Sequence, residues 1–500
     1  MSLGKVVRSF LRSSVGISIG RSKPETKAAA AEPLATIPDD ADPRFNCLAW
    51  GSGMDGKLGH GHSDFRTLRS NPNIAYFAGS RLRSVAVGVS HSAAIVEEFL
   101  PEGLVVAGSS AVSPKTIGTL YGWGSNFYGQ AGFATTDQKM GSASFFTSDD
   151  SDDLDSVEVP CKLKLLVPQG ITVDMRKVAC GDFHSAALAA DGTLWTWGAG
   201  CLGRKDELYD SNAILVDFFP NRNRSVVDVK AAGTLTVALA QPSKTSTESL
   251  SQSTEPESRE VYMWGYFLDP SSSSSQLLRK STSPLLIADA LELDAVTHIA
   301  ASSQCFAIVG KKKDSEASLV RVYGPFWSIK EGTDFEMPMY PTFHEMQNVD
   351  QIYEHAPVLE LNIQAGVVVK DVHLFRDLGL IVREDGVVEA FLAQGAASSA
   401  NVASQRKVEF FNCPKGVDEI SCNNFGMLVI FKGGEARFWG FTNAAEVVEG
   451  QESLSQTRGL DVLRIVGSVE GEVVLTEGAQ AGTIGWDHGL VFQSGPEEDK

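Results

Sequence analysis

The amino-acid sequence predicts an all-β protein, a seven-bladed β-propeller of four-stranded antiparallel blades whose ring is closed by pairing of N- and C-terminal strands. Two observations predict this fold class. Two strand-like phrases each occur seven times, with successive copies about 50 to 75 residues apart, which is typical of a radial repeat. The two ends of the chain also hold complementary parts of one repeat, as closure of a ring requires.

The first phrase is a strand of small and apolar residues, clearest at residues 178–188, and it is followed by Asp191-Gly192. An Asp-Gly pair favours the type I′ turn of a β-hairpin. We expect the small residues to line the crowded axis of the propeller. The other copies lie near residues 85–96, 229–239, 299–309, 372–382, 420–430 and 465–475.

The second phrase ends in an aromatic residue that glycine follows in most copies. We expect each aromatic ring to fill the space between neighbouring blades, and each glycine to allow the sharp turn after the strand. The copies end at Trp50-Gly51, Trp123-Gly124, Trp197-Gly198, Trp264-Gly265, Tyr323-Gly324, Phe391-Leu392 and Trp439-Gly440.

The order of the two phrases predicts how the ring closes. The first Trp-Gly has no small-residue strand before it, and the last small-residue strand has no clear Trp-Gly after it. Pairing residues 45–51 with residues 463–475 would complete one blade from both ends and leave no open sheet edge. The strand-like residues 489–492 are an alternative closing element, and the sequence leaves both open.

Residues 1–23 differ sharply from the rest of the chain, because they contain five Lys or Arg residues, six serines and no acid. On a helical projection the apolar and basic residues separate to opposite sides, which is typical of a mitochondrial presequence. The alternative is a basic tail that contacts DNA phosphates in a nuclear protein. Residues 24–44 hold four prolines among alanines and are expected to be a linker.

The propeller itself is expected to span residues 45–495, with a short tail at 496–500. Acidic or Ser-rich insertions interrupt its repeats. These insertions lie at residues 137–158, 241–260 and 269–284.

Composition excludes several classes of function. The 62 acidic and 43 basic residues give a net charge of −19, which favours basic protein partners over nucleic acid. No run of apolar residues is long enough for a membrane span. The seven cysteines are scattered and form no CxxC pair, which indicates a reducing compartment without structural zinc.

No motif predicts a cofactor or a catalytic site. Residues 51–56 and 198–203 match a glycine-rich dinucleotide fingerprint. Both, however, occupy the same place in the repeat, directly after Trp-Gly, and neither opens a helix that could hold a pyrophosphate. Lys57 completes most of a phosphate-binding loop, yet Leu58 stands where a magnesium-binding hydroxyl is needed. We therefore expect turn glycines, no cofactor and no metal.

The repeats resemble those of the regulator of chromosome condensation family. The resemblance lies in residues 50–59, 121–130 and 178–188. It is close over residues 45–240, whereas the remainder keeps the repeat spacing with fewer of the repeat's typical residues. It implies a seven-bladed propeller that works as a binding platform. Some members are guanine-nucleotide exchange factors for small GTPases, and many others are interaction modules.

The resemblance also points to a candidate protein-binding site on the turns after the small-residue strands. In exchange factors of the family, acidic and histidine side chains of such turns contact the GTPase. Here Asp182, His184 and Asp377 could form a site of this kind. His91 occupies the same repeat position as His184, which favours a hydrogen bond that holds the adjoining turn.

An acidic run in the second repeat is the other candidate site for a basic partner. The alternative is a solvated loop without a binding role. The run consists of Asp149, Asp150, Asp152, Asp153, Asp155 and Glu158.

These observations lead to three functional hypotheses. The first is a non-catalytic scaffold of the mitochondrial matrix that binds basic subunits of a large assembly, such as the mitochondrial ribosome, as a component or assembly factor. The second is an exchange factor or regulator of a GTPase. The third is a nuclear, chromatin-associated protein.

Overall fold

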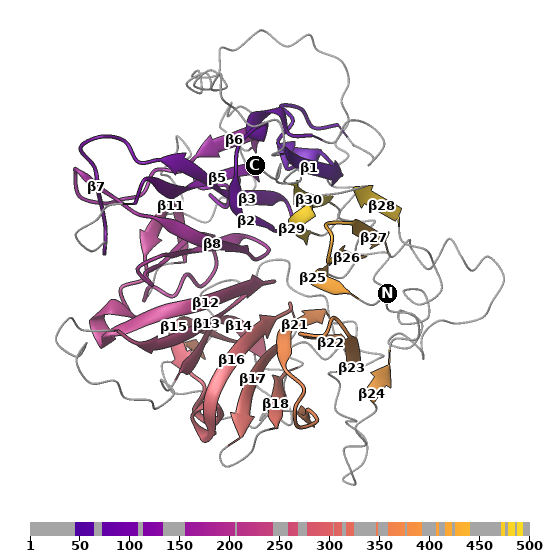
Figure 1. The fold of residues 1–500 in the computed structure, drawn as a ribbon. Coiled ribbons are helices and arrows are strands. Elements are labelled where there is room, and N and C mark those ends of the chain that lie inside the picture. The colour runs from indigo at the N-terminus through magenta and orange to yellow at the C-terminus, as the bar shows by residue number, and fades with distance from the viewer. Residues whose placement is uncertain are drawn as a thin grey trace.

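In the computed structural model, seven antiparallel sheets are arranged around a common axis (Figure 1). The prediction of a seven-bladed propeller is confirmed. The structure describes residues 46–64, 73–108, 114–133, 156–205, 208–243, 259–268, 278–303, 305–312, 317–324, 347–348, 359–375, 378–392, 407–409, 416–422, 426–440, 472–475, 479–485 and 488–493. Residues 1–45, with the predicted presequence and linker, lie outside this set.

Blades 2 and 3 are regular four-stranded sheets that follow the chain order from the axis outward. Blade 2 consists of β2 (Leu82–Val87), β3 (His91–Phe99), β5 (Thr116–Ser125) and β6 (Ser156–Lys162). Blade 3 consists of β8 (Met175–Cys180), β9 (His184–Ala189), β10 (Leu194–Ala199) and β11 (Tyr209–Leu215). A small parallel pair, β4 (Val105–Val106) and β7 (Ile171–Thr172), joins the loops of these blades.

The next four blades repeat this plan. Blade 4 holds β12 (Arg224–Ala232), β13 (Leu235–Pro242), β14 (Glu260–Leu268) and β15 (Leu278–Leu286), with β19 (Gln347–Asn348) added in parallel. Blade 5 holds β16 (Leu293–Ala301), β17 (Phe306–Lys312), β18 (Ser318–Tyr323) and β20 (Leu359–Asn362). Blade 6 holds β21 (Val369–Phe375), β22 (Leu378–Arg383), β23 (Val388–Leu392) and β24 (Lys407–Glu409). Blade 7 holds β25 (Val417–Cys422), β26 (Gly426–Phe431), β27 (Ala436–Gly440) and β28 (Glu472–Leu475).

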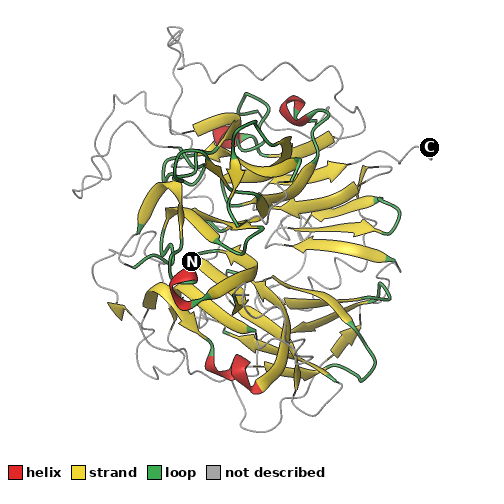
Figure 2. Cartoon of the chain, turned by 60° about the vertical axis from the view of Figure 1, so that its left-hand side comes forward, coloured by secondary structure: helices red, strands yellow, loops and turns green. Residues whose placement is uncertain are grey.

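Helices contribute little to this architecture in the described part of the chain. Figure 2 shows stacked strands with short helical turns at the periphery. These are the 3-10 turns η1 (Met54–Gly56), η2 (Ala75–Phe77), η3 (Pro220–Arg222) and η4 (Ala288–Glu292). The core therefore lies between the faces of neighbouring sheets.

Blade 1 closes the ring from both ends of the chain. It consists of β29 (Ala479–Ile484), β30 (His488–Gln493) and β1 (Asn46–Gly51), and an isolated bridge from Leu48 to Asn73 marks its outer edge. The six residues of β1 pair in unbroken antiparallel register with β30, from Asn46 opposite Gln493 to Gly51 opposite His488.

The first of the two predicted closures is wrong, and the alternative at residues 489–492 is correct. β28, within residues 465–475, pairs with β27 as the outer strand of blade 7. The seventh innermost strand is therefore β29 and not the apolar stretch before it. Its small residues end at Gly485, and the step from Gly485 to His488 repeats the step from Gly181 to His184. This spacing is the sequence signal that identifies the closing blade.

The predicted role of the Trp-Gly aromatics is seen directly at two blade contacts. The Trp123 indole N–H donates to the carbonyl of Lys57 at 2.9 Å, and that of Trp197 donates to the carbonyl of Gln130 at 3.0 Å. Both indoles are fully buried. Lys57 and Gln130 occupy the same position in the turns of the preceding blades, so each tryptophan joins its own blade to the one before it.

Candidate protein-binding site

The histidines at the start of β3, β9 and β30 connect neighbouring blades. His488 Nε2 hydrogen-bonds Ser92 Oγ at 3.1 Å, His91 Nε2 hydrogen-bonds Ser185 Oγ at 2.8 Å, and His184 Nε2 hydrogen-bonds Thr236 Oγ1 at 2.7 Å. In each case the hydroxyl belongs to the next blade. The series stops at blade 4, where Leu235 occupies the histidine position opposite Gly265.

This placement removes His91 and His184 from any contact with a partner. Their exposed fractions are 0% and 2%. The inner-turn glycines explain the close fit, since a Cβ on Gly181 would lie 2.3 Å from Cε1 of His184 and 2.6 Å from the carbonyl oxygen of Gly233. The two histidines therefore act in the joints between blades, as buried polar groups with local partners do.

These buried histidines make stability depend on pH. Burial lowers the pKa of His91 to about 3, helped by the nearby His184 and His488, and burial lowers the pKa of His184 to about 4. In the unfolded chain these histidines take up protons below their ordinary pKa of 6.5. In the folded ring they stay neutral until the pH is much lower. Stability is therefore fully present above that pH and is lost as the pH falls toward the folded pKa values.

We expect the free energy of unfolding to fall between pH 6.5 and pH 4 by about 1.4 kcal/mol per pH unit for each of the two histidines. Urea unfolding at several pH values measures this slope. The H91N/H184N double variant should have lower stability at neutral pH and a shallower slope. An unchanged slope in the double variant would contradict the assignment, because other groups would then account for the acid sensitivity.

Asp182 lies on the turn between β8 and β9, at the rim where the innermost strands end. Its backbone N–H donates to the carbonyl of Gly233 at 2.7 Å, which fixes the turn against blade 4. Among the described residues, nothing hydrogen-bonds or pairs with its carboxylate, which is half-buried. Burial raises the pKa of Asp182 to about 6. A cation placed here by a partner would stabilise the ionised form.

Aromatic side chains gather at the turn that holds Asp182, and they were not predicted from the sequence. The Phe127 and Tyr128 rings meet edge to face at 4.8 Å, and the Tyr128 and Phe183 rings meet at 5.0 Å between centroids. Phe127 is 40% exposed. We call Phe127, Tyr128, Asp182 and Phe183 the Asp182 surface. Its sequence signal is the pair of aromatics that begins three residues after Trp123-Gly124.

Glu158 is the one remaining predicted site residue that the structure describes, and it does not belong to this surface. Glu158 is exposed on β6, the outermost strand of blade 2, where its carbonyl accepts the N–H of Gly61 at 2.9 Å. It thus packs beside a turn of blade 1. The others lie outside the described residues, namely Asp149, Asp150, Asp152, Asp153, Asp155 and Asp377.

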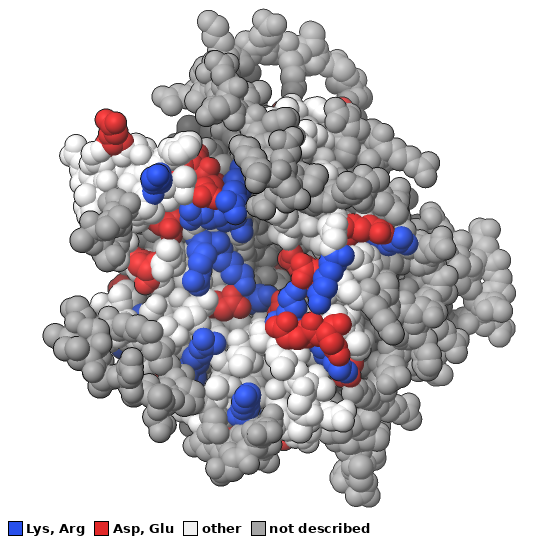
Figure 3. Space-filling view, viewed as in Figure 1, with Lys and Arg blue, Asp and Glu red and all other residues white. Residues whose placement is uncertain are grey.

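A second group of charged side chains lies at the opposite end of the axis, where the innermost strands begin. One repeat position, directly before a buried aliphatic residue, carries a charged residue or a histidine in five consecutive blades. Figure 3 shows basic and acidic side chains gathered around the hollow at the centre of this face. The five residues are Lys177, Asp228, His298, Asp371 and Glu419.

Ion pairs connect this axial cluster across blades. Lys177 pairs with Asp228 of the next blade. Lys230 Nζ lies 4.0 Å from Asp371 Oδ2, so this contact runs from blade 4 to blade 6 past His298 of blade 5. Sequence reasoning missed the cluster, because the pairs form between strands that are far apart in the chain.

Comparison with known protein families agrees with the repeat pattern. Models of the regulator of chromosome condensation (RCC1) repeat match residues 46–95, 118–188 and 175–204. Residues 46–204 contain RCC1 repeats. The matches cover β1, most of blade 2, and β8 to β10 of blade 3, where the sequence pattern is most regular.

Curated relatives align with part of this chain. The human probable E3 ubiquitin-protein ligase HERC3 is 29% identical over 164 residues, which are 33% of this chain and 11% of the relative. The ultraviolet-B receptor UVR8 of Arabidopsis thaliana is 30% identical over 155 residues, 31% of this chain and 26% of the receptor. The mitochondrial RCC1 domain-containing protein RUG3 of Arabidopsis thaliana is 25% identical over 196 residues, 32% of this chain and 40% of the relative. The chain thus matches only a minor part of each of these relatives.

Two solved structures share the fold over nearly the whole chain. Human WBSCR16 superposes with a TM-score of 0.53 at 15% identity, covering 90% of this chain and 99% of that one. Prp20p of Saccharomyces cerevisiae gives a TM-score of 0.53 at 14% identity over 91% and 93% of the two chains. The report on Prp20p describes its binding to Gsp1p and histones. At this identity the likeness establishes the fold.

Two further properties concern only the part of the chain that the structure describes. No helix there is long and apolar enough to cross a membrane. No three histidine, cysteine, aspartate or glutamate side chains converge there as a metal ion would require.

Proposed function

We propose that the protein is a non-catalytic scaffold of the mitochondrial matrix that binds basic proteins through the Asp182 surface. These basic proteins would be subunits of a large complex such as the mitochondrial ribosome, and the protein would be a component or an assembly factor of that complex. The mitochondrial relative RUG3 and the basic, acid-free residues 1–23 support the compartment. The net charge of −19 supports basic partners.

One observation carries the binding proposal: a half-buried carboxylate that has no partner among the described residues, in a turn whose neighbouring rings include the exposed Phe127. A lysine or arginine of another protein would supply the charge that Asp182 lacks within its own fold. The same side chain would lie against the rings of Phe183 and Tyr128, where a cation–π contact contributes about 0.5–1 kcal/mol or more. Aromatic residues are enriched at the centres of protein interfaces, and arginine is the charged residue that is enriched with them.

Regulation of a GTPase is the second candidate. A Caenorhabditis elegans homologue of the X-linked retinitis pigmentosa GTPase regulator is 29% identical over 133 residues, and Asp182 is placed where a partner could reach it. Against this, His91 and His184 are held in the blade joints, so Asp182 is the only one of these three side chains at the surface. A nuclear, chromatin-associated role is the third candidate and depends on the basic residues 1–23.

The test compares D182N and F183A with the matched control E102Q, which removes one exposed charge elsewhere. We expect affinity purification from cells to recover basic mitochondrial proteins with the parent and E102Q. D182N and F183A should recover at least tenfold less of these proteins, while unfolding at the same temperature as the parent. N-terminal sequencing of the purified protein tests the compartment, since import removes a presequence.

Two results would overturn the proposal. One is equal recovery of the same proteins by D182N, F183A and the parent. The other is accelerated nucleotide release from a recovered GTPase that disappears in D182N, which would establish the second candidate in its place.

A further inference from the structure

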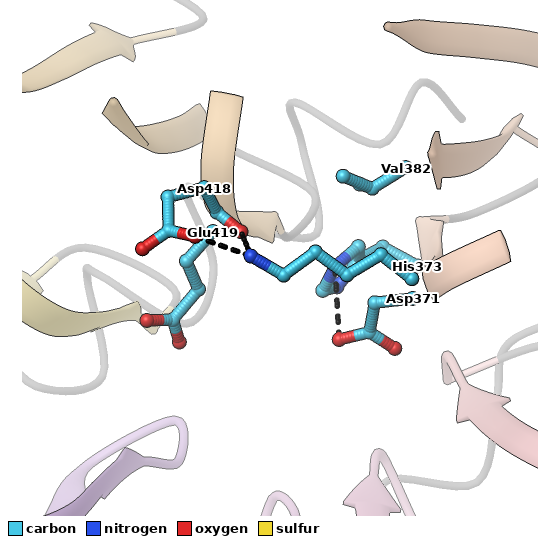
Figure 4. Close-up of a pocket in the computed structure, with 6 residues that line it drawn as sticks. Asp371, His373, Val382, Asp418 and Glu419 are labelled. Atoms are coloured by element: carbon cyan, nitrogen blue, oxygen red, sulfur yellow. Dashed lines mark hydrogen bonds and ion pairs between the residues drawn. The ribbon is translucent and has the colours of Figure 1, made fainter. Parts of the chain in front are cut away.

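A cavity at the start of the innermost strands of blades 6 and 7 has the features of a binding site. Its volume is about 230 Å³, far above the ~10–15 Å³ that one water molecule needs. Figure 4 shows its charged side chains, contributed by β21 and β25. It is lined by Lys370, Asp371, His373, Val382, Asp418 and Glu419.

Most charges around the cavity already have partners within the protein. The Lys370 ammonium pairs with the Asp418 carboxylate and donates to the Asp418 carbonyl at 2.8 Å. Asp371 is near Lys230 at 4.0 Å and near His373 Nε2 at 3.4 Å. These contacts hold the walls in place across the two blades.

Glu419 is the exception. Within the described residues, nothing hydrogen-bonds or pairs with its carboxylate, and Figure 4 shows it extending beside the cavity, away from the Lys370–Asp418 pair. Burial raises the pKa of Glu419 to about 7, and the negative charge of Asp371 adds to this effect. Lys230 and Lys370 lower this pKa but do not cancel these effects, so the cations of the protein itself compensate the Glu419 carboxylate only in part.

We propose that this cavity binds one cationic side-chain head group, a guanidinium, from a basic partner protein. The guanidinium would form an ion pair with Glu419 and would also be attracted by the negative charge of Asp371. Its flat face would lie toward Val382. The inference rests on the proposed function, because it takes the partner to be a basic protein. It adds a second contact at the end of the axis opposite to the Asp182 surface.

Geometry favours a guanidinium over a metal ion. The carboxylates and the imidazole line the cavity from different sides, and no three donors converge in the described residues. A guanidinium spreads its charge over a plane with several N–H donors and is weakly hydrated, so it tolerates a partly buried site better than an ammonium or a small ion does. Two carboxylates from different walls of the cavity, Asp371 on β21 and Glu419 on β25, suit such a planar donor.

The experiment measures binding of N-acetyl-arginine methylamide to the purified full-length protein by NMR titration or calorimetry. E419Q removes the unpaired charge, and E384Q is its control, because Glu384 is exposed outside the cavity. We expect weak saturable binding to the parent and to E384Q, and at least tenfold weaker binding to E419Q. E419D should retain binding, and the lysine analogue should bind more weakly than the arginine probe.

A second readout separates binding from folding. Free E419Q should unfold at an equal or higher temperature than the parent, since it loses an uncompensated charge beside Asp371. No saturable binding to the folded parent, or equal binding to E419Q and E384Q, would overturn the inference. The probe assay does not depend on partner capture, so equal recovery of the same proteins by D182N and the parent would count against the proposed function alone.

Discussion

Deletion of residues 488–500 should abolish the folded ring. The deletion removes β30, which pairs with β1 on one side and β29 on the other. Leu490, Val491 and Phe492, all at most 2% exposed, go with it. Both the sheet and the core of blade 1 are then lost, which leaves open strand edges on blades that were closed. We expect an insoluble or aggregated product.

Solubility, size-exclusion behaviour and the cooperativity of thermal unfolding measure this effect. The matched control is deletion of residues 494–500, which leaves β30 in place and should unfold like the parent. A monomeric product that still unfolds cooperatively after loss of β30 would show that blade 1 does not close the ring.

Trp123→Ala should be the most destabilising single substitution in the described blades. It removes a fully buried side chain, which costs about 3–5 kcal/mol in a protein core. It also removes the indole N–H that donates to the Lys57 carbonyl across the joint of blades 1 and 2. The two losses fall at the joint next to the closure, so we expect the free energy of unfolding to decrease by at least that range.

Trp123→Phe separates the two contributions. It keeps most of the aromatic packing and loses the hydrogen bond, so it should cost about 1–2 kcal/mol. Urea unfolding of both variants gives the comparison. Equal costs for the two substitutions would mean that the hydrogen bond to Lys57, and not the volume of the ring, dominates the joint.

The fold could be predicted from the sequence because its signals are local. The seven aromatic strand ends lie on β1, β5, β10, β14, β18, β23 and β27, the predicted strands in each blade. Six of the seven small-residue strands were also placed correctly. The seventh was misplaced because residues 465–475 are apolar and alternate much as β29 does. Only the spacing from Gly485 to His488 distinguishes the innermost strand from an outer one.

The candidate sites were harder to predict, for a physical reason. Asp182 could be found because it lies within a repeated turn, and its residue type differs from the equivalents in other blades. Phe127 and Tyr128 belong to a different blade from Phe183, so their contact depends on how two blades pack. The pairing of Lys230 with Asp371 depends on three blades at once. No periodicity along the chain encodes such contacts across the axis.

The split origin of blade 1 sets the order of events during synthesis. β1 is made among the first described residues, and its partner β30 is made last. At about 5–20 residues per second, on the order of a minute passes before β1 can pair. Throughout that interval the apolar strand from Cys47 to Trp50 has no sheet to join. The seam of the ring thus forms only after the strands of the other six blades have been made, and β1 is the segment for which a chaperone would matter most.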